Sequence, residues 1–331
     1  MQGLRQFYQQ QGLSQRVADI MIHAKRPSTH KQYDCYLKAW HQYTATLNIN
    51  PFQASYTVAI EFLETLRTTR QLGYNALNTA RSALSSILAP IDSVPFGKHH
   101  LVKTYMRGVF NIRPPVPRYS QTWDPNLVLE LLRQWHPTKT LDLKKLTLKV
   151  LMLILLVSGQ RLQTVFFMSL DNMRSTSSSF TFVIADLLKQ SRPGYKNPSI
   201  ILQSYPKDER LCIFTLLKAY IQRTAPLRKD VRALFICVNK PHGPASKDTL
   251  SRWVKLVLET AGIDTDRFAP HSTRSASSSA AKRGGAPLQE ILDTAGWTGD
   301  NVFARYYDKP VSNRSQTSYD VAVLGAPSVS R

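Results

Sequence analysis

The stretch Pro270-His271-Ser272-Thr273-Arg274 places a histidine and an arginine three positions apart. Residues at this spacing lie on one face of a helix. Pro270 and Ser272 indicate that a helix begins here, so both side chains are expected in its first turn, near the positive end of the helix dipole. Because such a pair is common by chance, the surrounding sequence decides what it means.

Three other features surround this pair. Arg161 follows the end of the most apolar run in the chain, and Trp297 and the pair Tyr306-Tyr307 come after Arg274. Two arginines, a histidine, an indole donor and a tyrosine can bind a phosphodiester and attack it without a metal. Other interpretations stay open, since Arg161 also fits a surface arginine at a helix end and Trp297 a plain core aromatic.

The overall charge indicates a polyanionic partner. The chain has 331 residues, a net charge of +21 and a pI near 10.0. An excess of this size points most simply to nucleic acid, and a basic ribosome- or membrane-associated protein is the alternative. Residues 1–118 hold 14 Lys and Arg against 5 Asp and Glu, and the remainder holds 29 against 17. Both parts are therefore candidates for DNA contact.

Other classes are excluded by residue usage. Cys35, Cys212 and Cys237 have no CxxC spacing, and the eight histidines form no ligand cluster, so we expect no disulfide framework, metal site or cofactor. The longest apolar run, Val150 to Val157, is too short to span a bilayer, and the N-terminus lacks an apolar signal core. We expect an intracellular protein without a membrane segment or a small-molecule substrate.

The first 112 residues carry helical patterns and no alternating strand pattern. Val17, Ile20 and Met21 form one apolar stripe, Ser28 is a candidate cap for a second helix, and three more helical segments follow. A compact helical domain is expected over residues 1–112.

Residues 113–119 hold three prolines, which remove backbone donors and fix φ. This composition is typical of a stiff linker between domains, and a surface loop within one domain is the alternative. A second domain is expected over residues 120–310. The Ser-rich stretch 311–331 is expected to be an arm or a tail.

The second part mixes helices with one hairpin. Leu143 through Val157 is nearly all apolar and lacks a polar face, which predicts a fully buried helix. Phe180 to Ile184 and Ile200 to Leu202 are expected to be the strands of a hairpin. The other expected helices cover residues 125–135, 211–224, 247–261, 272–283 and 287–295. The fold class is therefore mainly α with a small antiparallel β-sheet.

The order Arg…His-x-x-Arg…Trp…Tyr resembles the tyrosine recombinase (phage integrase) family. Ser158-Gly159-Gln160-Arg161 is similar to its first arginine motif. The run from Arg283-Gly284-Gly285 to Ala295-Gly296-Trp297 resembles the spacing to its second histidine, which is tryptophan in some members. The family usually has an acidic residue three positions after the first arginine, where this chain has Thr164. The resemblance covers residues 14 to 310.

This resemblance implies a two-domain recombinase architecture, with residues 1–112 as a helical core-binding domain and residues 120–310 as an α+β catalytic domain that together clamp duplex DNA. It implies site-specific DNA recombination through a 3′-phosphotyrosine and a free 5′ hydroxyl, without metal or ATP. Two alternatives stay open. One is an inactive DNA-binding protein of the same fold, and the other is an enzyme that relaxes DNA like a type IB topoisomerase.

The resemblance also implies a role for each candidate catalytic residue. Arg161 and Arg274 would bind the non-bridging oxygens of the phosphate, and His271 would bind the phosphate or transfer a proton. Trp297 would offer its indole N–H. Lys189, placed where the first hairpin strand meets its turn, would protonate the leaving 5′ oxygen.

Two tyrosines compete for the role of nucleophile. The spacing from Trp297 that is usual in the family falls on Tyr306, whereas a second resemblance favours Tyr307. Phe303, one turn before Tyr307, would brace it by an i,i+4 contact, and Tyr306 would then pack into the core. We favour Tyr307, because a packing position accepts Tyr or Phe but a nucleophile needs the oxygen.

That second resemblance is to the recombinases of eukaryotic DIRS-type retrotransposons. It is carried by phrases such as Lys189-Gln190-Ser191-Arg192-Pro193-Gly194 and Tyr307-Asp308-Lys309-Pro310. It implies integration of a mobile element and a nuclear location; a chain that is not eukaryotic would be cytoplasmic.

The partners that follow are double-stranded DNA and further copies of the chain, as a dimer on one site and a tetramer in a synapse. Basic side chains in the first domain and in the hairpin turn are the candidate DNA contacts outside the catalytic set. They are Lys25, Arg26, Lys31, Arg81, Arg192 and Lys196.

Overall fold

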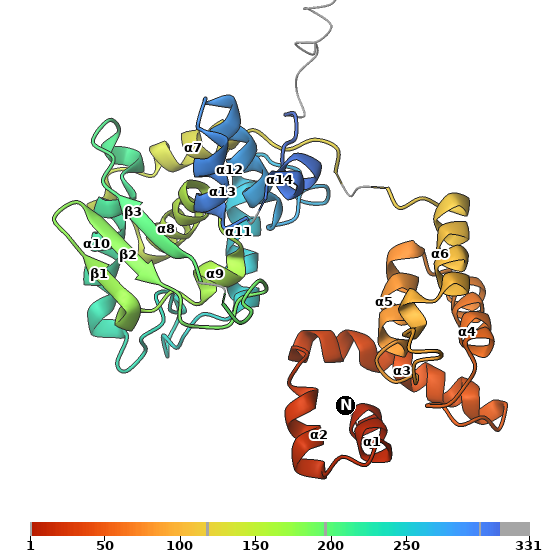
Figure 1. Ribbon diagram of the computed structural model, residues 1–331. Helices are drawn as coiled ribbons and strands as arrows, with labels where there is room; N and C mark the ends of the chain where they lie inside the picture. The colour runs from red at the N-terminus through yellow and green to blue at the C-terminus, as the bar shows by residue number, and fades with distance from the viewer. Residues whose placement is uncertain (1, 117–118, 195–196, 298, 312–331) are drawn as a thin grey trace, which may run out of the picture. The chain divides into compact units, whose positions relative to one another are not determined.

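The chain forms two compact units, Met1–Pro117 and Arg118–Arg331, each with its own hydrophobic core (Figure 1). The computed structural model describes residues 2–116, 119–194, 197–297 and 299–311. Among these residues, none of the helices has both the length and the apolar character needed to cross a membrane.

The first unit is helical. Trp40 lies at its centre, packed edge-on against Phe62 with ring centroids 5.2 Å apart. The third helix begins at Pro27 with Arg26 as its N-cap, so Ser28 is not the cap; proline is favoured at the first helical position because its fixed φ already suits a helix. The helices are α1 (Gln2–Gln10), α2 (Gln15–Ile22), α3 (Pro27–Thr46), α4 (Tyr56–Thr69), α5 (Tyr74–Leu84) and α6 (His100–Ile112).

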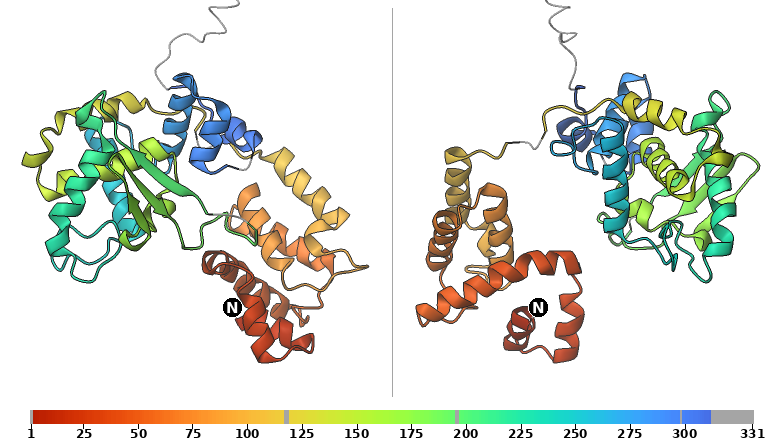
Figure 2. Two further views of the ribbon diagram at one scale, coloured as in Figure 1. Left: turned by 60° about the vertical axis from the view of Figure 1, so that its left-hand side comes forward. Right: turned by 180° about the vertical axis from the view of Figure 1, so that it is seen from behind.

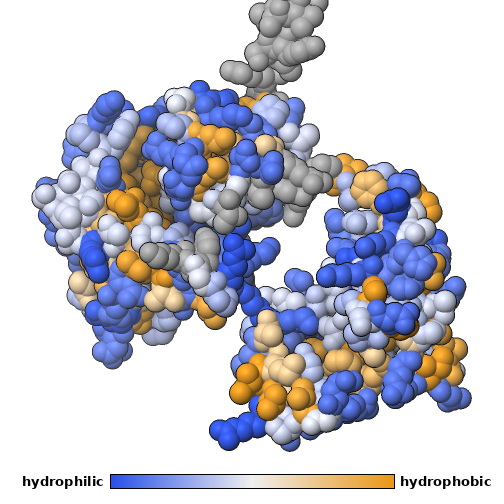
Figure 3. Space-filling model, in the orientation of Figure 1, coloured by the Kyte–Doolittle hydropathy of each residue, from blue (hydrophilic) through white to orange (hydrophobic). Residues whose placement is uncertain are grey.

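The apolar stripe that the sequence indicated on α2 lies on the exposed side of this helix. Val17, Ile20 and Met21 face solvent, with Ile20 70% exposed, while Ala18 and Ile22 are buried. The reason is that α2 packs against α1, a helix that the sequence pattern did not indicate. The hydrophobic surface over α2 is visible in Figure 3.

The second unit combines helices with a three-stranded antiparallel sheet in the order β1-β2-β3. In the β2-β3 pair, Phe180 lies opposite Leu202 and Phe182 opposite Ile200, which confirms the predicted hairpin. The third strand, β1, was not predicted. Helices α8 and α10 pack against β3 (Figures 1 and 2). The elements are α7 (Pro125–Gln134), α8 (Leu143–Ser158), α9 (Leu162–Phe166), β1 (Met173–Ser175), β2 (Ser179–Val183), β3 (Ser199–Gln203), α10 (Ile213–Thr224), α11 (Lys247–Thr260), α12 (Ser272–Arg283), α13 (Leu288–Ala295) and α14 (Asp300–Tyr306).

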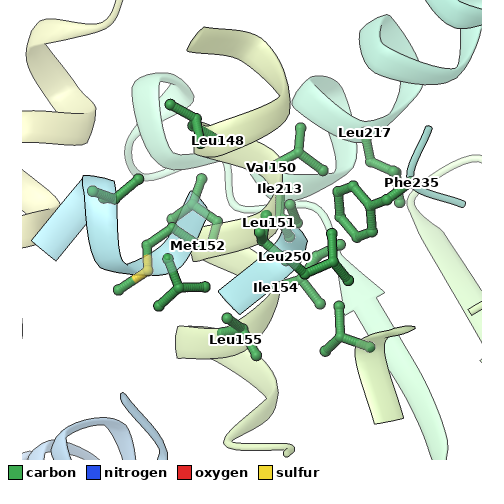
Figure 4. Close-up of a cluster of buried hydrophobic side chains, with 14 of the residues drawn as sticks. Leu148, Val150, Leu151, Met152, Ile154, Leu155, Ile213, Leu217, Phe235 and Leu250 are labelled. Atoms are coloured by element: carbon green, nitrogen blue, oxygen red, sulfur yellow. The ribbon is translucent and has the colours of Figure 1, made fainter. Parts of the chain in front are cut away.

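Helix α8 runs through the core of this unit, as its nearly all-apolar sequence predicted, although Lys144 and Lys145 in its first turn and Val157 near its end are exposed. The Asp142 side chain caps it by accepting a hydrogen bond from the Lys145 backbone N–H at 2.7 Å. Figure 4 shows its leucine, isoleucine and methionine side chains packed among residues of α10 and α11. Together with the small sheet, this arrangement confirms the predicted fold class, mainly α with an antiparallel sheet.

Candidate active site

Arg161 is presented by the turn that ends α8. Gly159 has φ +56°, a left-handed conformation that favours glycine, and it ends the helix two residues before the arginine. Gln160 is buried and donates from Nε2 to the Thr294 carbonyl at 2.7 Å, which ties the turn to α13. Arg161 is half-buried and donates from Nη1 to Gln190 Oε1 at 2.6 Å. The arginine is therefore held between α8, α13 and the loop after β2.

Lys189 lies in that loop and not at a strand end. Strand β2 stops at Val183, because the chain then turns into a loop held by Asn197, whose Nδ2 donates to the carbonyls of Ile184 and Asp186 at 3.0 and 2.8 Å. Lys189 is exposed on this loop, next to the residue that binds Arg161. Arg192 is also exposed, and Lys196 lies outside the described residues.

His271 and Arg274 open α12, as the sequence predicted. His271 is the exposed N-cap residue, and its Nε2 forms a hydrogen bond with the hydroxyl of Tyr119. Arg274 is only 3% exposed, and its guanidinium lies 4.2 Å from the centroid of the Trp297 ring. A guanidinium stacked on an indole is held in place by cation–π attraction. One turn of helix thus presents an exposed imidazole and a buried cation.

Trp297 is both a packing residue and a potential donor. Its ring is 8% exposed and packs against Phe303 and Tyr307, with centroids 5.4 and 4.7 Å away. Its indole Nε1 is buried and has no acceptor among the described residues. A buried N–H without a partner is costly, so this donor is available to an oxygen that enters the site.

Tyr307 lies against the same cluster. Its half-buried ring is 5.3 Å from the Arg274 guanidinium, and Phe303 is 1% exposed against Trp297. Tyr307 packs against the hydrophobic cluster that holds Phe303 and Trp297, and its backbone N–H donates to the Phe303 carbonyl at 2.8 Å. Tyr306 ends α14, and its side chain lies outside the described part of the structure.

A row of serines on α12 holds the backbone of Tyr307. The hydroxyls of Ser275 and Ser279 both donate to the Tyr307 carbonyl, the former at 3.1 Å, and Ser279 also accepts from the Lys309 N–H at 3.1 Å. Lys282 adds an ion pair with Asp308. These residues were not among the site residues predicted from the sequence. The sequence feature that could have indicated them is the run Ser275-Ala276-Ser277-Ser278-Ser279. Serine is unfavourable inside a helix, because its hydroxyl competes for backbone hydrogen bonds, so a run of serines in a helix suggests that the hydroxyls have other partners.

The predicted site residues are thus brought together in part. Arg274, Trp297 and Tyr307 are in direct contact, and His271 lies one turn before Arg274 on the same chain segment. Arg161 and the Lys189 loop are joined through Gln190. Thr164 occupies the position at which the family that the sequence resembles usually has an acidic residue. It is 1% exposed and therefore lies in the core.

Within the described residues, no group of three His, Cys, Asp or Glu side chains lies close enough together to hold a metal ion. The side chains gathered at the site offer guanidinium, imidazole, indole and hydroxyl groups for contact with an anion.

Comparison with known proteins identifies the family of this chain. The family model described as "Phage integrase family" matches residues 126–312, more than half of the chain. Among curated protein sequences no relative matches.

Several solved structures are similar in fold. The Tn1549 transposon integrase in complex with transposon right end DNA has a TM-score of 0.59 at 14% identity over 97% of this chain and 98% of that one. The XerH site-specific recombinase bound to palindromic difH substrate has 0.58 at 15% identity, over 84% and 75%. A lambda integrase tetramer bound to a Holliday junction has 0.54 at 12% identity, over 89% and 76%. The match of the family model, whose span takes in Arg161, His271, Arg274, Trp297 and both tyrosines, shows that the chain belongs to the phage integrase family of tyrosine recombinases, DNA-breaking and rejoining enzymes.

Proposed function

We propose that this recombinase cuts one DNA strand by attack of the Tyr307 oxygen on a phosphorus atom, with Tyr306 as the alternative nucleophile. The new bond is a 3′-phosphotyrosine, and the bond that breaks releases a 5′ hydroxyl. The bond energy is stored in the protein–DNA linkage, so attack by a different 5′ hydroxyl rejoins the strands. The observation that carries this proposal is the direct contact of Arg274 with both Trp297 and Tyr307.

Each group has a role in this scheme. In-line displacement builds negative charge on the phosphate oxygens, and the guanidinium groups of Arg161 and Arg274 offset it where it develops. The orphan N–H of Trp297 supplies a further donor. His271 binds the phosphate or accepts the proton of the nucleophile. Lys189, on its exposed loop, gives a proton to the leaving 5′ oxygen.

Covalent trapping tests the proposal. The substrate is a randomised pool of duplexes that each carry a nick. The nick lets the short fragment released by cleavage diffuse away, so the strands cannot be rejoined and the protein stays covalently attached to the DNA. On phenol extraction this DNA partitions with the protein. We expect the adduct to form in the presence of EDTA. DNA binding without any adduct would favour the inactive DNA-binding alternative, and relaxation of supercoiled plasmid without exchange of strands would favour the topoisomerase-like one.

We further propose that the first unit binds the DNA backbone through a hollow of about 330 Å³. Lys25, Arg81 and Lys98 line it together with Ser82, Ser85, Ser86 and Gly97, and no acidic residue is among them. Arg81 donates from Nη1 to the Gly97 carbonyl at 3.0 Å, and its buried Nε has no acceptor among the described residues. Burial lowers the pKa of Lys25, because it disfavours the charged form of the amine. The negative charge of a bound phosphate would stabilise that charged form.

The other basic candidates are less enclosed. Lys31 is exposed on α3 and Arg192 on the loop after β2, while Arg26 is half-buried at the start of α3. For these side chains we propose contacts with phosphate that raise affinity and salt dependence without fixing the DNA position.

The assembly and setting are also proposals. The lambda integrase structure is a tetramer bound to a Holliday junction, and we propose that this chain works as a dimer on one site and a tetramer in the synapse. The phrases shared with DIRS-type recombinases support integration of a retrotransposon, and hence work on chromosomal DNA in the nucleus. The assignment can be tested by offering the protein DNA from the two ends of the retrotransposon that encodes it and asking which of these DNAs form the covalent adduct.

A further inference from the structure

Tyr119 contacts the site from an element that the catalytic scheme does not use. Its hydroxyl forms a hydrogen bond with His271 Nε2, and the two rings lie 5.7 Å apart. On its other side the Tyr119 ring packs near Phe268, at 5.9 Å. Tyr119 is also the first described residue after the Pro-rich segment 113–118. The first described residue of the second unit therefore contacts His271, the candidate proton-transfer residue.

Residues 119–123, which we call the strap, form hydrogen bonds with two segments of the site: the start of α12 and the residues after α14. Trp123 Nε1 donates to Ser272 Oγ at 2.9 Å, at the start of α12. The Thr122 N–H donates to the Pro310 carbonyl at 2.7 Å, just after the tyrosine pair. In Figure 1 the yellow chain that leads into α7 runs beside the blue C-terminal helices. The strap thus links the segment that carries His271 with the segment that follows Tyr307.

Lys309 contacts both the backbone and the ring of Tyr119. Its Nζ donates to the Tyr119 carbonyl at 2.5 Å and lies 4.9 Å from the centroid of the Tyr119 ring. The backbone N–H of Lys309 is in turn bound by Ser279 on α12. With its carbonyl and its ring both engaged, Tyr119 has a defined position from which its hydroxyl reaches His271.

We infer that Tyr119 is a positioning residue that fixes the orientation and tautomer of His271. Which nitrogen of a neutral imidazole carries the proton is set by the hydrogen bond of the other nitrogen. A phenol O–H that donates to Nε2 leaves the proton on Nδ1, so His271 presents an Nδ1–H donor to the phosphate. If the ring becomes protonated, Nε2–H donates instead to the phenol oxygen, because a hydroxyl can serve in both directions. This role rests on the phosphate-binding role proposed for His271, since an imidazole with Nδ1–H and with Nε2 bound by Tyr119 has no free nitrogen to accept the proton of the nucleophile.

The variant Tyr119→Phe removes the hydroxyl and keeps the ring contacts with Phe268 and Lys309. We expect the rate of adduct formation at saturating DNA to fall about tenfold, the effect of losing one hydrogen bond, while DNA affinity stays unchanged. The matched control is Gln121→Ala, which alters a strap residue that bonds Arg267 and not His271. It should leave the rate as in the wild type.

A double-mutant cycle separates positioning from general support of the fold. If Tyr119 acts through His271, Tyr119→Phe has no further effect on the rate in a His271→Ala background. An equal loss in both backgrounds, or a wild-type rate for Tyr119→Phe alone, would overturn the inference.

Nitrogen NMR of the free full-length protein, labelled at histidine, tests the contact without any cleavage. The His271 signals, identified by their loss in His271→Ala, should show the Nδ1–H tautomer and shift toward the Nε2–H form in Tyr119→Phe. Unchanged His271 signals would contradict the inference. A tautomer shift in a protein that forms no adduct would instead retain the contact and refute the proposed function.

Discussion

Helices α8 and α12 are neighbours in the second unit and are both largely buried, yet their sequences are opposites. Helix α8 buries leucine, isoleucine, valine and methionine almost throughout, whereas α12 buries Ser272, Thr273, Arg274, Ser275, Ser278 and Ser279. The two helices pack together, and the Ser277 hydroxyl donates to the Leu156 carbonyl at their contact.

The difference separates building the fold from building the site. Burial of apolar side chains stabilises a core in proportion to the area removed from water, which is the role of α8. Buried hydroxyls contribute little net stability, and each needs a partner. On α12 the partners of Ser275 and Ser279 are the backbone of Tyr307 and Lys309. Polar burial on α12 therefore places the tyrosine segment beside Arg274.

The largest effect on stability is expected from the apolar helix. Ile154 is fully buried in the α8 cluster shown in Figure 4. Ile154→Ala should lower the free energy of unfolding by about 2–5 kcal/mol through lost burial and a cavity. Denaturant unfolding measures this change. At a temperature where the variant stays folded, its rate of adduct formation should be close to that of the wild type; a large specific loss of rate would break the division of roles.

The largest effect on chemistry is expected from Arg274 on the polar helix. Arg274→Ala should reduce the rate of adduct formation by about 10²-fold or more, because a preorganised donor for the phosphate is lost. Arg252→Ala is the charge-matched control, since Arg252 is exposed on α11 and bonds only to Thr249 among the described residues. Single-turnover rates on a nicked duplex check both variants. Equal losses would mean that charge alone, and not the placement of Arg274, sets the rate.

A smaller effect is expected where α12 holds Tyr307. Ser279→Ala removes a hydroxyl that binds the Tyr307 carbonyl and the Lys309 N–H, and the adduct rate should fall about tenfold through misplacement of the tyrosine. Ser278→Ala is the matched control, because this equally buried hydroxyl donates only to carbonyls of its own helix. Similar rates for the two variants would show that the serine row has no positioning role.

The last effect is confined to high pH and concerns the single charge on α8 that lies inside the core. Lys149 is fully buried and donates to the Trp135 carbonyl at 2.6 Å, and burial lowers its pKa from 10.5 to about 8. Between about pH 8 and 10.5 the unfolded chain binds this proton and the folded chain does not, so folding stability should rise with pH in that window. Each pKa unit corresponds to about 1.4 kcal/mol, so the gain across this window is on the order of 3 kcal/mol. Lys149→Met should lack this rise in unfolding experiments; a rise of equal size in the variant would assign it to other groups.

The contrast between the helices also explains what the sequence could predict. The apolar run of α8 and the alternation of β2 and β3 identify themselves by composition and period, and His271 and Arg274 were found through their spacing. The serine contacts and the strap were not found, because a hydroxyl has the same signature whether it faces water or a distant carbonyl. The exposure of Val17, Ile20 and Met21 was not predicted either, because α2 buries Ala18 and Ile22 and packs against α1, a helix that was not recognised in the sequence.

The central claim is that α12 places Tyr307 for attack on DNA. The most direct measurement is to digest the trapped protein–DNA adduct and identify by mass spectrometry the tyrosine that carries the nucleotide, in the wild type and in the Tyr306→Phe and Tyr307→Phe variants. We expect the modification on Tyr307, adduct retained in Tyr306→Phe, and none in Tyr307→Phe. A nucleotide on Tyr306, with full adduct from Tyr307→Phe, would contradict the account.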